Sequence, residues 1–336
     1  MQFDLEPFVE NVRQSVRDHS LDTSRGIYRR WIRMNSNPTC HLGDSGYGSA
    51  DAANILFTIG DFAPSAEQSD AWVTHLQTFQ DPATGLFREP CMNNPIHSTA
   101  FLAATLELFH AAPKYPLHKL LPYLDPEKLA DFLQHLDWQG NPWAQSHHGA
   151  GLFAAFANTG IAAPAWKRAY FDWLNTHLDP EYPLSPAGAV QSGKAMEAHH
   201  LFGWFHYLFN YEYAHEPFPY PEKLLDRCLA MYSENRLGDL FGRQIEFPEV
   251  DWIYAINRAR RQTPHRFAET DMQLRDFAER YCTWLLNADP ATDEGFNDLH
   301  TLFGAITALA ELQIALPGVI LTHIPLKNVL DRRPFI

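Results

Sequence analysis

The chain has 336 residues, of which 46% are hydrophobic and 20% are charged. This length and composition suit one large domain or two ordinary ones built around a sizeable core. Acidic residues outnumber basic residues by 40 to 26, and the formal net charge is −14. Such an excess of negative charge argues against a general nucleic-acid binder, which needs a basic face to meet phosphate.

The cysteines and the N-terminal sequence bear on the cellular compartment in which the protein is expected. The four cysteines form no CxxC pair and are typical of free thiols in a reducing compartment, with two disulfides as the alternative. The first residues, "MQFDLEPFVENVRQ", lack the basic start and the apolar stretch of a signal peptide. No run approaches the roughly 18 apolar residues of a membrane helix. We therefore expect a soluble cytoplasmic protein without membrane or nucleic-acid partners, and the sequence leaves its oligomeric state open.

Six segments along the chain share one pattern, in which a Gly- or Pro-rich loop leads into an apolar helix rich in small residues. In chain order they are 46–62, 91–111, 143–160, 192–212, 246–262 and 295–313. A polar residue stands near the start of each helix, and these residues recur about every 50 positions: Asp51, His97, His148, His200, Asp251 and His300. A fixed period of this length indicates a repeated supersecondary unit.

A second set of helices is expected between these segments, at 3–19, 67–79, 126–136, 164–177, 221–235 and 269–287. Here apolar residues recur at i, i+3, i+4 and i+7 with charges between them, as in "PEKLADFLQHL". Runs of alternating β-branched residues are scarce. The sequence therefore predicts an all-α chain, with residues 1–336 forming a single domain of six helical hairpins. The more apolar helices form an inner barrel and the amphipathic helices an outer layer. The C-terminal stretch "LTHIPLKNVLDRRPFI" is expected to pack along the outside.

This pattern resembles the (α/α)6 toroid, an architecture shared by six-hairpin glycosidases, toroid polysaccharide lyases, sugar epimerases and the prenyltransferase and terpene-cyclase group. The resemblance covers nearly the whole chain at the level of architecture and identifies no specific family. The loop "QDPATGLF" at 80–87 resembles the repeat loops of prenyltransferases and squalene cyclases. The stretch "NNPIH" at 93–97 resembles the Asn/His pairing of toroid lyases and the helix starts of the epimerases.

In a ring of parallel inner helices, the helix starts meet at one mouth, so the six recurring residues are candidate catalytic groups around one cavity. Histidine is not a preferred N-cap residue, and a helix dipole keeps a nearby histidine neutral. In the pairs at 147–148 and 199–200 only one residue can face the cavity, and the period selects His148 and His200. His147, His199 and His206 are expected elsewhere. Candidate substrate-binding residues at the same mouth are Tyr47, Arg88, Asn93, Asn94, Trp143, Gln145, Trp204, Arg243 and Trp252.

Because histidines outnumber carboxylates in this set, we expect acid–base catalysis on a sugar or uronate, of the lyase or epimerase type. His97 and His200 are the expected proton-transfer pair, with His148 orienting a small-molecule or oligosaccharide substrate. Asn94 and Arg88 would hold a carboxylate and stabilise an enolate. No cofactor motif is present in the sequence.

Four alternatives remain open at this stage. Asp51 and Asp251 would serve a glycoside hydrolase if they face each other. A zinc enzyme would use His97, His148, His200 and His300, although no HExxH motif supports it. An aromatic cavity would suit a terpene cyclase or prenyltransferase, but the DxDD and DDxxD motifs are missing. A non-enzymatic scaffold is the remaining interpretation.

Overall fold

A computed structural model describes residues 2–92 and 94–334 of the chain. Helices dominate this part of the chain, which confirms the all-α class. Two minimal sheets accompany them. β1 (Phe3–Asp4) pairs in parallel with β4 (Ile320–Leu321), and β2 (Ser20–Asp22) pairs antiparallel with β3 (Ile27–Tyr28). Short 3-10 turns lie in the connections: η1 (Thr23–Arg25), η2 (Leu121–Leu124), η3 (Val190–Ser192), η4 (Glu294–Phe296) and η5 (Val329–Asp331).

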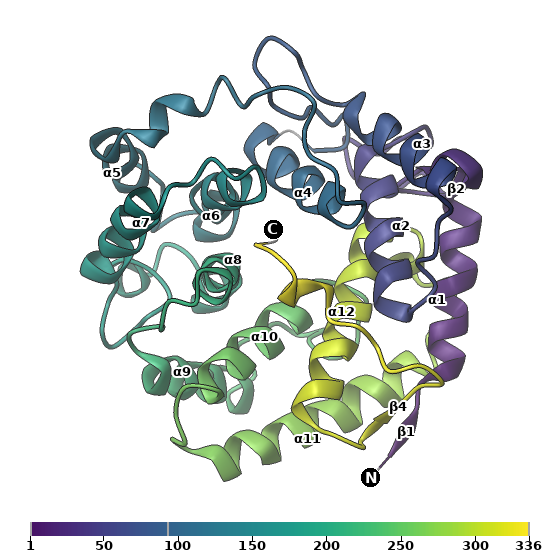
Figure 1. Ribbon diagram of the computed structural model, residues 1–336. Helices are drawn as coiled ribbons and strands as arrows, with labels where there is room; N and C mark the ends of the chain where they lie inside the picture. The colour runs from purple at the N-terminus through teal and green to yellow at the C-terminus, as the bar shows by residue number, and fades with distance from the viewer. Residues whose placement is uncertain (1, 93, 335–336) are drawn as a thin grey trace.

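The apolar segments of the sequence form helices around a common centre (Figure 1). Each of these inner helices packs against the next, and the last packs against the first. They are α2 (Gly46–Ile59), α4 (Pro95–Glu107), α6 (Pro142–Asn158), α8 (Glu197–Ala214), α10 (Pro248–Arg260) and α12 (Leu299–Ala315). Burial on nearly all sides explains their apolar character, since α12 exposes almost none of its residues.

The amphipathic segments form helices outside the first set (Figure 1). They are α1 (Glu6–His19), α3 (Ala66–Gln77), α5 (Pro126–Gln134), α7 (Pro164–His177), α9 (Pro221–Ser233) and α11 (Phe267–Leu285). Only one face of each is buried. In α5 this face is reduced to Leu129 and Leu133. The alternation of two helix types read from the sequence is thus present in the structure.

Side-chain caps fix where three of the inner helices begin. Ser45 accepts a hydrogen bond from the backbone N–H of Gly48 in α2 (3.1 Å), and Asn94 accepts one from His97 in α4 (3.2 Å). Asp298 accepts one from His300 in α12 (2.9 Å). These caps satisfy N–H groups that have no partner within the helix. They also place His97 and His300 in the first turn of their helices, at the same end of the inner set.

The C-terminal segment 322–334 covers the opposite end of the inner helices, and the expectation that it packs along the outside is wrong. Asn328 donates to Glu311 of α12 (2.5 Å), and Asp331 pairs with Arg258 of α10 (2.5 Å). Arg332 pairs with Glu107 at the end of α4 (2.8 Å). The segment is drawn to this place because its apolar residues Val329 and Leu330 are buried there. Figure 1 shows it running inward to the centre of the helices.

None of the helices within the described residues combines the length and the apolar character that crossing a bilayer requires.

Gly48 allows the loop before α2 to lie directly on that helix. A Cβ atom at this position would stand 2.5 Å from the carbonyl carbon of Arg29 and 2.7 Å from the nitrogen of Arg30. We therefore expect Gly48→Ala to lower the free energy of unfolding by about 1–3 kcal/mol through overpacking. Gly43→Ala is the control, because a Cβ there would meet its nearest neighbour at 3.6 Å. Chemical denaturation measures both, and equal stability of the two variants would contradict the account.

Candidate functional site

A cavity of about 220 Å³ lies between the inner helices. Most of its lining is apolar, and apart from Thr307 its polar lining residues are of the kinds that transfer protons or bind anions: Arg30, His97, His147, His206, Asp251 and His300. They come from the loop before α2 and from α4, α6, α8, α10 and α12. One polar group from almost every inner helix therefore faces the same small space.

The four histidines are close enough to interact. The ring centroids of His97 and His147 are 4.3 Å apart, and those of His147 and His206 are 4.9 Å apart. The rings of His97 and His300 are 6.5 Å apart and nearly perpendicular. At such distances a positive charge on one ring disfavours a positive charge on the others.

Three of the histidines are oriented by a hydrogen bond through Nδ1. His97 Nδ1 bonds with the hydroxyl of Tyr47, His206 Nδ1 with the hydroxyl of Ser146 (2.9 Å), and His300 Nδ1 with Asp51 Oδ1 (2.9 Å). These bonds fix the rings and leave Nε2 for another partner. Burial raises the pKa of the Tyr47 hydroxyl well above its usual value, so Tyr47 stays protonated.

Burial also sets the charge of the histidines. It holds the pKa of His147 at about 3, with the neighbouring His148 and His300 adding to the effect. It lowers the pKa of His300 to about 3 as well, with a contribution from Arg30. The pKa values of His97 and His206 are well below the ordinary value for the same reason, burial first and the other histidines second. All four rings are therefore neutral at pH 7.

The pair formed by Asp51 and His300 carries no net charge. Burial raises the pKa of Asp51 well above that of an ordinary carboxyl and lowers the pKa of His300. Asp51 therefore keeps its proton and His300 is neutral. When that proton lies on Oδ1 and is donated to Nδ1 of His300, the ring hydrogen of His300 is on Nε2. His300 can thus donate a hydrogen bond or a proton into the cavity.

Asp251 is a second buried acid. Its side chain is 1% exposed, and its Oδ2 atom has no hydrogen-bond partner among the described residues. Burial, and secondarily the nearby Glu249, raises the pKa of Asp251 well above its usual value. Asp251 is therefore protonated at neutral pH and can donate a proton.

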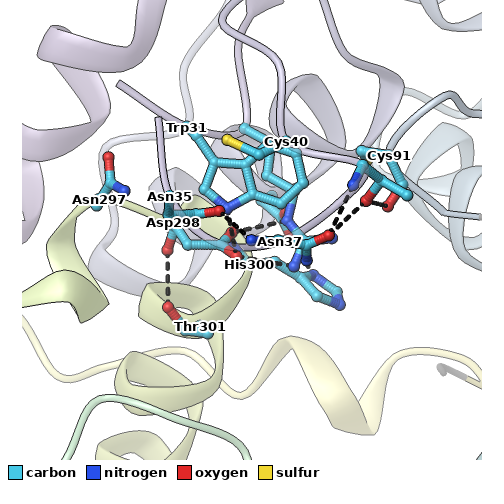
Figure 2. Close-up of polar contacts among 12 residues, drawn as sticks. Trp31, Asn35, Asn37, Cys40, Cys91, Asn297, Asp298, His300 and Thr301 are labelled. Carbon is cyan, nitrogen blue, oxygen red and sulfur yellow. Dashed lines mark hydrogen bonds and ion pairs between the residues drawn. The ribbon is translucent and has the colours of Figure 1, made fainter. Parts of the chain in front are cut away.

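Arg30 is the positively charged residue of the site, and it forms an ion pair with Asp298. Its Nε and Nη2 atoms each donate to Asp298 at 2.8 Å. Burial alone would raise the pKa of Asp298, but Arg30 outweighs this and holds that pKa below its usual value. Trp31 Nε1 also donates to Asp298 (2.9 Å), and Figure 2 shows this carboxylate between Trp31 and the first turn of α12.

The structure places the candidate catalytic residues in three groups. His97, Asp251 and His300 line the cavity as expected. Asp51 lies behind His300 and does not line it. His148 and His200 do not line the cavity, and His200 Nδ1 bonds instead with the Ser185 hydroxyl (2.7 Å).

The errors at His148 and His200 have a geometric cause. Adjacent helical residues point about 100° apart, so a period of about 50 residues cannot choose between His147 and His148. On α8, the residue that bonds with Ser146 of α6 and lines the cavity is His206 and not His200. Six residues of helix separate those two histidines, a rise of about 9 Å.

Among the candidate substrate-binding residues, only Trp143 lines the cavity. Tyr47 supports His97 from behind, and Asn94 caps α4. Arg88 is exposed and pairs with Asp81 (2.9 Å), Gln145 is not among the lining residues, and Arg243 lies beside Arg280 in a surface hollow. Asn93 lies outside the described residues.

Trp204 and Trp252 pack against neighbouring side chains and do not line the cavity. Trp204 stacks on Tyr207 with ring centroids 5.0 Å apart. Trp252 stacks on Tyr232 of α9, also at 5.0 Å, and donates through Nε1 to the carbonyl of Cys228 (3.1 Å).

Sequence reasoning missed two kinds of lining residue. Arg30 stands in a loop outside the repeat, and no periodic signal marks it. The apolar part of the lining includes Phe205, Phe209, Phe303 and Leu330. In the sequence, these residues cannot be distinguished from residues of the hydrophobic core. His147 and His206 were visible as histidines but were assigned to other surroundings.

The residues considered for zinc are not gathered in one place. His97 and His300 line the cavity, whereas His148 and His200 do not. Within residues 2–92 and 94–334, no group of three or more His, Cys, Asp or Glu side chains is arranged to hold a metal ion.

Comparison with family models, curated proteins and solved structures found no match to this chain.

The low pKa of His147 predicts how acid affects stability. An unfolded histidine has a pKa of about 6.5. Below that pH, His147 is protonated in the unfolded chain but stays neutral in the folded protein. Its contribution to the free energy of unfolding therefore decreases as the pH falls toward 3. Between pH 7.5 and pH 5 the loss is about 2 kcal/mol. Wild-type protein should therefore lose about that much more than His147→Gln over this range.

The measurement is urea denaturation of both proteins at the two pH values. His135→Gln is the control, because the side chain of His135 is 75% exposed. It should follow the wild type. An identical pH response of wild type and His147→Gln would show that His147 is not held neutral.

Proposed function

We propose that the helices form an (α/α)6 toroid and that the chain is an acid–base enzyme of the lyase or isomerase type. It acts on one small carboxylate bound in the central cavity. The observation that carries the proposal is the convergence of four neutral histidines and a protonated Asp251 on a single cavity. Neutral imidazole accepts protons and a neutral carboxylic acid donates them, so the cavity has both halves of a proton-transfer reaction.

His147 is the proposed base. No hydrogen bond within the described residues engages its ring, so an Nε2 or Nδ1 lone pair is available to a substrate. Its pKa of about 3 makes it a weak base in the empty site. A bound carboxylate raises the pKa of a neighbouring histidine, because the negative charge favours the imidazolium. The substrate's own charge thus activates the base.

His300 and Asp251 are the proposed acids. Proton loss from a carbon next to a carboxylate or carbonyl leaves an enolate, which needs hydrogen-bond donors at its oxygens. His300 Nε2–H and the Asp251 carboxyl supply such donors, and Arg30, whose charge is balanced by Asp298, lines the same cavity. In an isomerisation the donor gives its own proton to a carbon of the enolate, and His147 keeps the proton that it removed. In an elimination it protonates the leaving group.

Size and acid placement favour this reading over hydrolysis of a polysaccharide. A cavity of about 220 Å³ holds one small molecule and not a chain of sugars. Hydrolysis needs two carboxyl groups flanking the bond. Asp251 lines the cavity, but Asp51 is covered by His300.

The test is exchange of a carbon-bound hydrogen with solvent. The protein is incubated in D₂O with a panel of small uronates, aldonates and hydroxy carboxylates, and deuterium at carbon is followed by NMR. We expect exchange with at least one member of the panel. His147→Gln should slow it by about 10²–10⁴-fold, the range for loss of a positioned acid or base.

His148→Gln is the matched control, because His148 follows His147 on the same helix but does not line the cavity. It should retain exchange within a few-fold of wild type. Equal losses in both variants, or no exchange with any compound, would refute the proposed chemistry. Loss of exchange on adding a chelator would move the assignment to a metal enzyme.

A further inference from the structure

The cavity is elongated along α12. His300, Phe303, Gly304 and Thr307 line it, and their spacing of three, one and three places them on one face of that helix. Seven residues of α-helix rise about 10 Å. The cavity therefore has two ends, one at the first turn of α12 and one about two turns deeper.

The polar groups gather at the first end. His97 and His300 lie in the first turns of their helices, and His147 contacts His97 directly. The positive ends of the inner helix dipoles meet there, and Arg30, paired with Asp298, lines the same cavity. Asp251 adds an independent sign of a ligand, because its buried Oδ2 atom has no partner among the described residues.

The deep end is apolar. Phe209 of α8 and Phe303 of α12 form its walls. Thr307 offers no free hydroxyl, since its Oγ1 donates to the carbonyls of Phe303 (2.8 Å) and Gly304 (2.9 Å) within the helix. A ligand group at this depth meets carbon on most sides.

Leu330 of the C-terminal segment closes the deep end. It is 4% exposed and lines the cavity. Its neighbours are anchored on both sides, by the Asn328 bond to Glu311 and by the pairing of Asp331 with Arg258. The length of ligand that fits is therefore set by a residue outside the six hairpins.

We propose that the ligand of this cavity is an amphipathic monocarboxylate whose carboxylate lies among the histidines and whose alkyl or aryl group extends to Leu330. An apolar cavity of about 150 Å³ binds benzene. A cavity of about 220 Å³ thus accommodates one ring with a short carboxylate-bearing chain. The inference rests on the proposed function for the chemistry at the polar end, and it narrows the substrate class to carboxylates with an apolar part.

The proposal is tested by binding alone, so its outcome is separate from that of the exchange assay. The probes are 3-phenylpropionate, its uncharged amide 3-phenylpropionamide, and glucuronate, which has the charge without the apolar group. Affinities for the wild-type protein are measured by isothermal titration calorimetry. We expect 3-phenylpropionate to bind at least about tenfold more tightly than either of the other two.

Leu330 variants test the depth of the site. Leu330→Phe shortens the cavity and should weaken 3-phenylpropionate binding about tenfold or more. Leu330→Ala lengthens it and should improve binding of 4-phenylbutyrate relative to 3-phenylpropionate. Leu321→Ala is the control, because Leu321 belongs to the preceding strand and is 41% exposed. Circular dichroism establishes that each variant is folded.

Three results would overturn the proposal. They are equal or tighter binding of glucuronate, equal binding of the acid and its amide, and binding of 3-phenylpropionate that no Leu330 variant alters. Failure of all three probes to bind would overturn it as well. If 3-phenylpropionate binds as expected while the exchange assay is negative, the ligand class stands and the proposed catalysis fails.

Discussion

The ion pair between Arg30 and Asp298 is the contact on which the rest of the structure depends. It joins the loop before the first inner helix to the residue that caps the last one. Burying two charges is costly unless both are fully hydrogen-bonded. Here the carboxylate accepts from Arg30 twice, from Trp31 and from the backbone of His300. The same carboxylate thus closes the circle of inner helices and sets the position of His300.

The electrostatics of the cavity differ from those of the chain as a whole. The protein has a formal net charge of −14, yet its central cavity is lined by neutral rings, a protonated acid and one compensated arginine. Burial is the first cause at each of these histidines and at Asp251, and repulsion by other histidines adds to it at His97, His147 and His206. Under the proposed function, the histidines are neutral in the empty site, and the negative charge of a bound carboxylate raises their pKa.

The sequence was informative about the fold because each buried helix face requires apolar residues at a regular spacing, which can be recognised in the sequence. The alternation of apolar and amphipathic helices and the placement of His97, Asp251 and His300 near helix starts all followed from it. The rotation of each helix did not follow, because one residue of phase changes the direction of a side chain by about 100°. For this reason His147 faces the cavity where His148 was expected. On α8 the period selected His200, but His206, six residues further along the helix, lines the cavity.

Residues outside the repeat were beyond this kind of reasoning. Arg30 is brought to the cavity by a loop whose path depends on the close approach of Arg29 to Gly48. Leu330 reaches it only because the C-terminal segment turns back over the ends of α10 and α12. Both placements are set by contacts between segments far apart in the chain. A single sequence has no periodic signal for such contacts.

Four histidines share one cavity and are neutral there. Nitrogen NMR of protein with ¹⁵N-labelled histidine measures this protonation state, with the cavity signals assigned by single His→Gln variants and followed from pH 7.5 to pH 5. We expect His147 and His300 to keep the spectrum of neutral imidazole throughout, and His300 to carry its hydrogen on Nε2. Protonation of either residue near pH 6.5, the ordinary value for histidine, would contradict it.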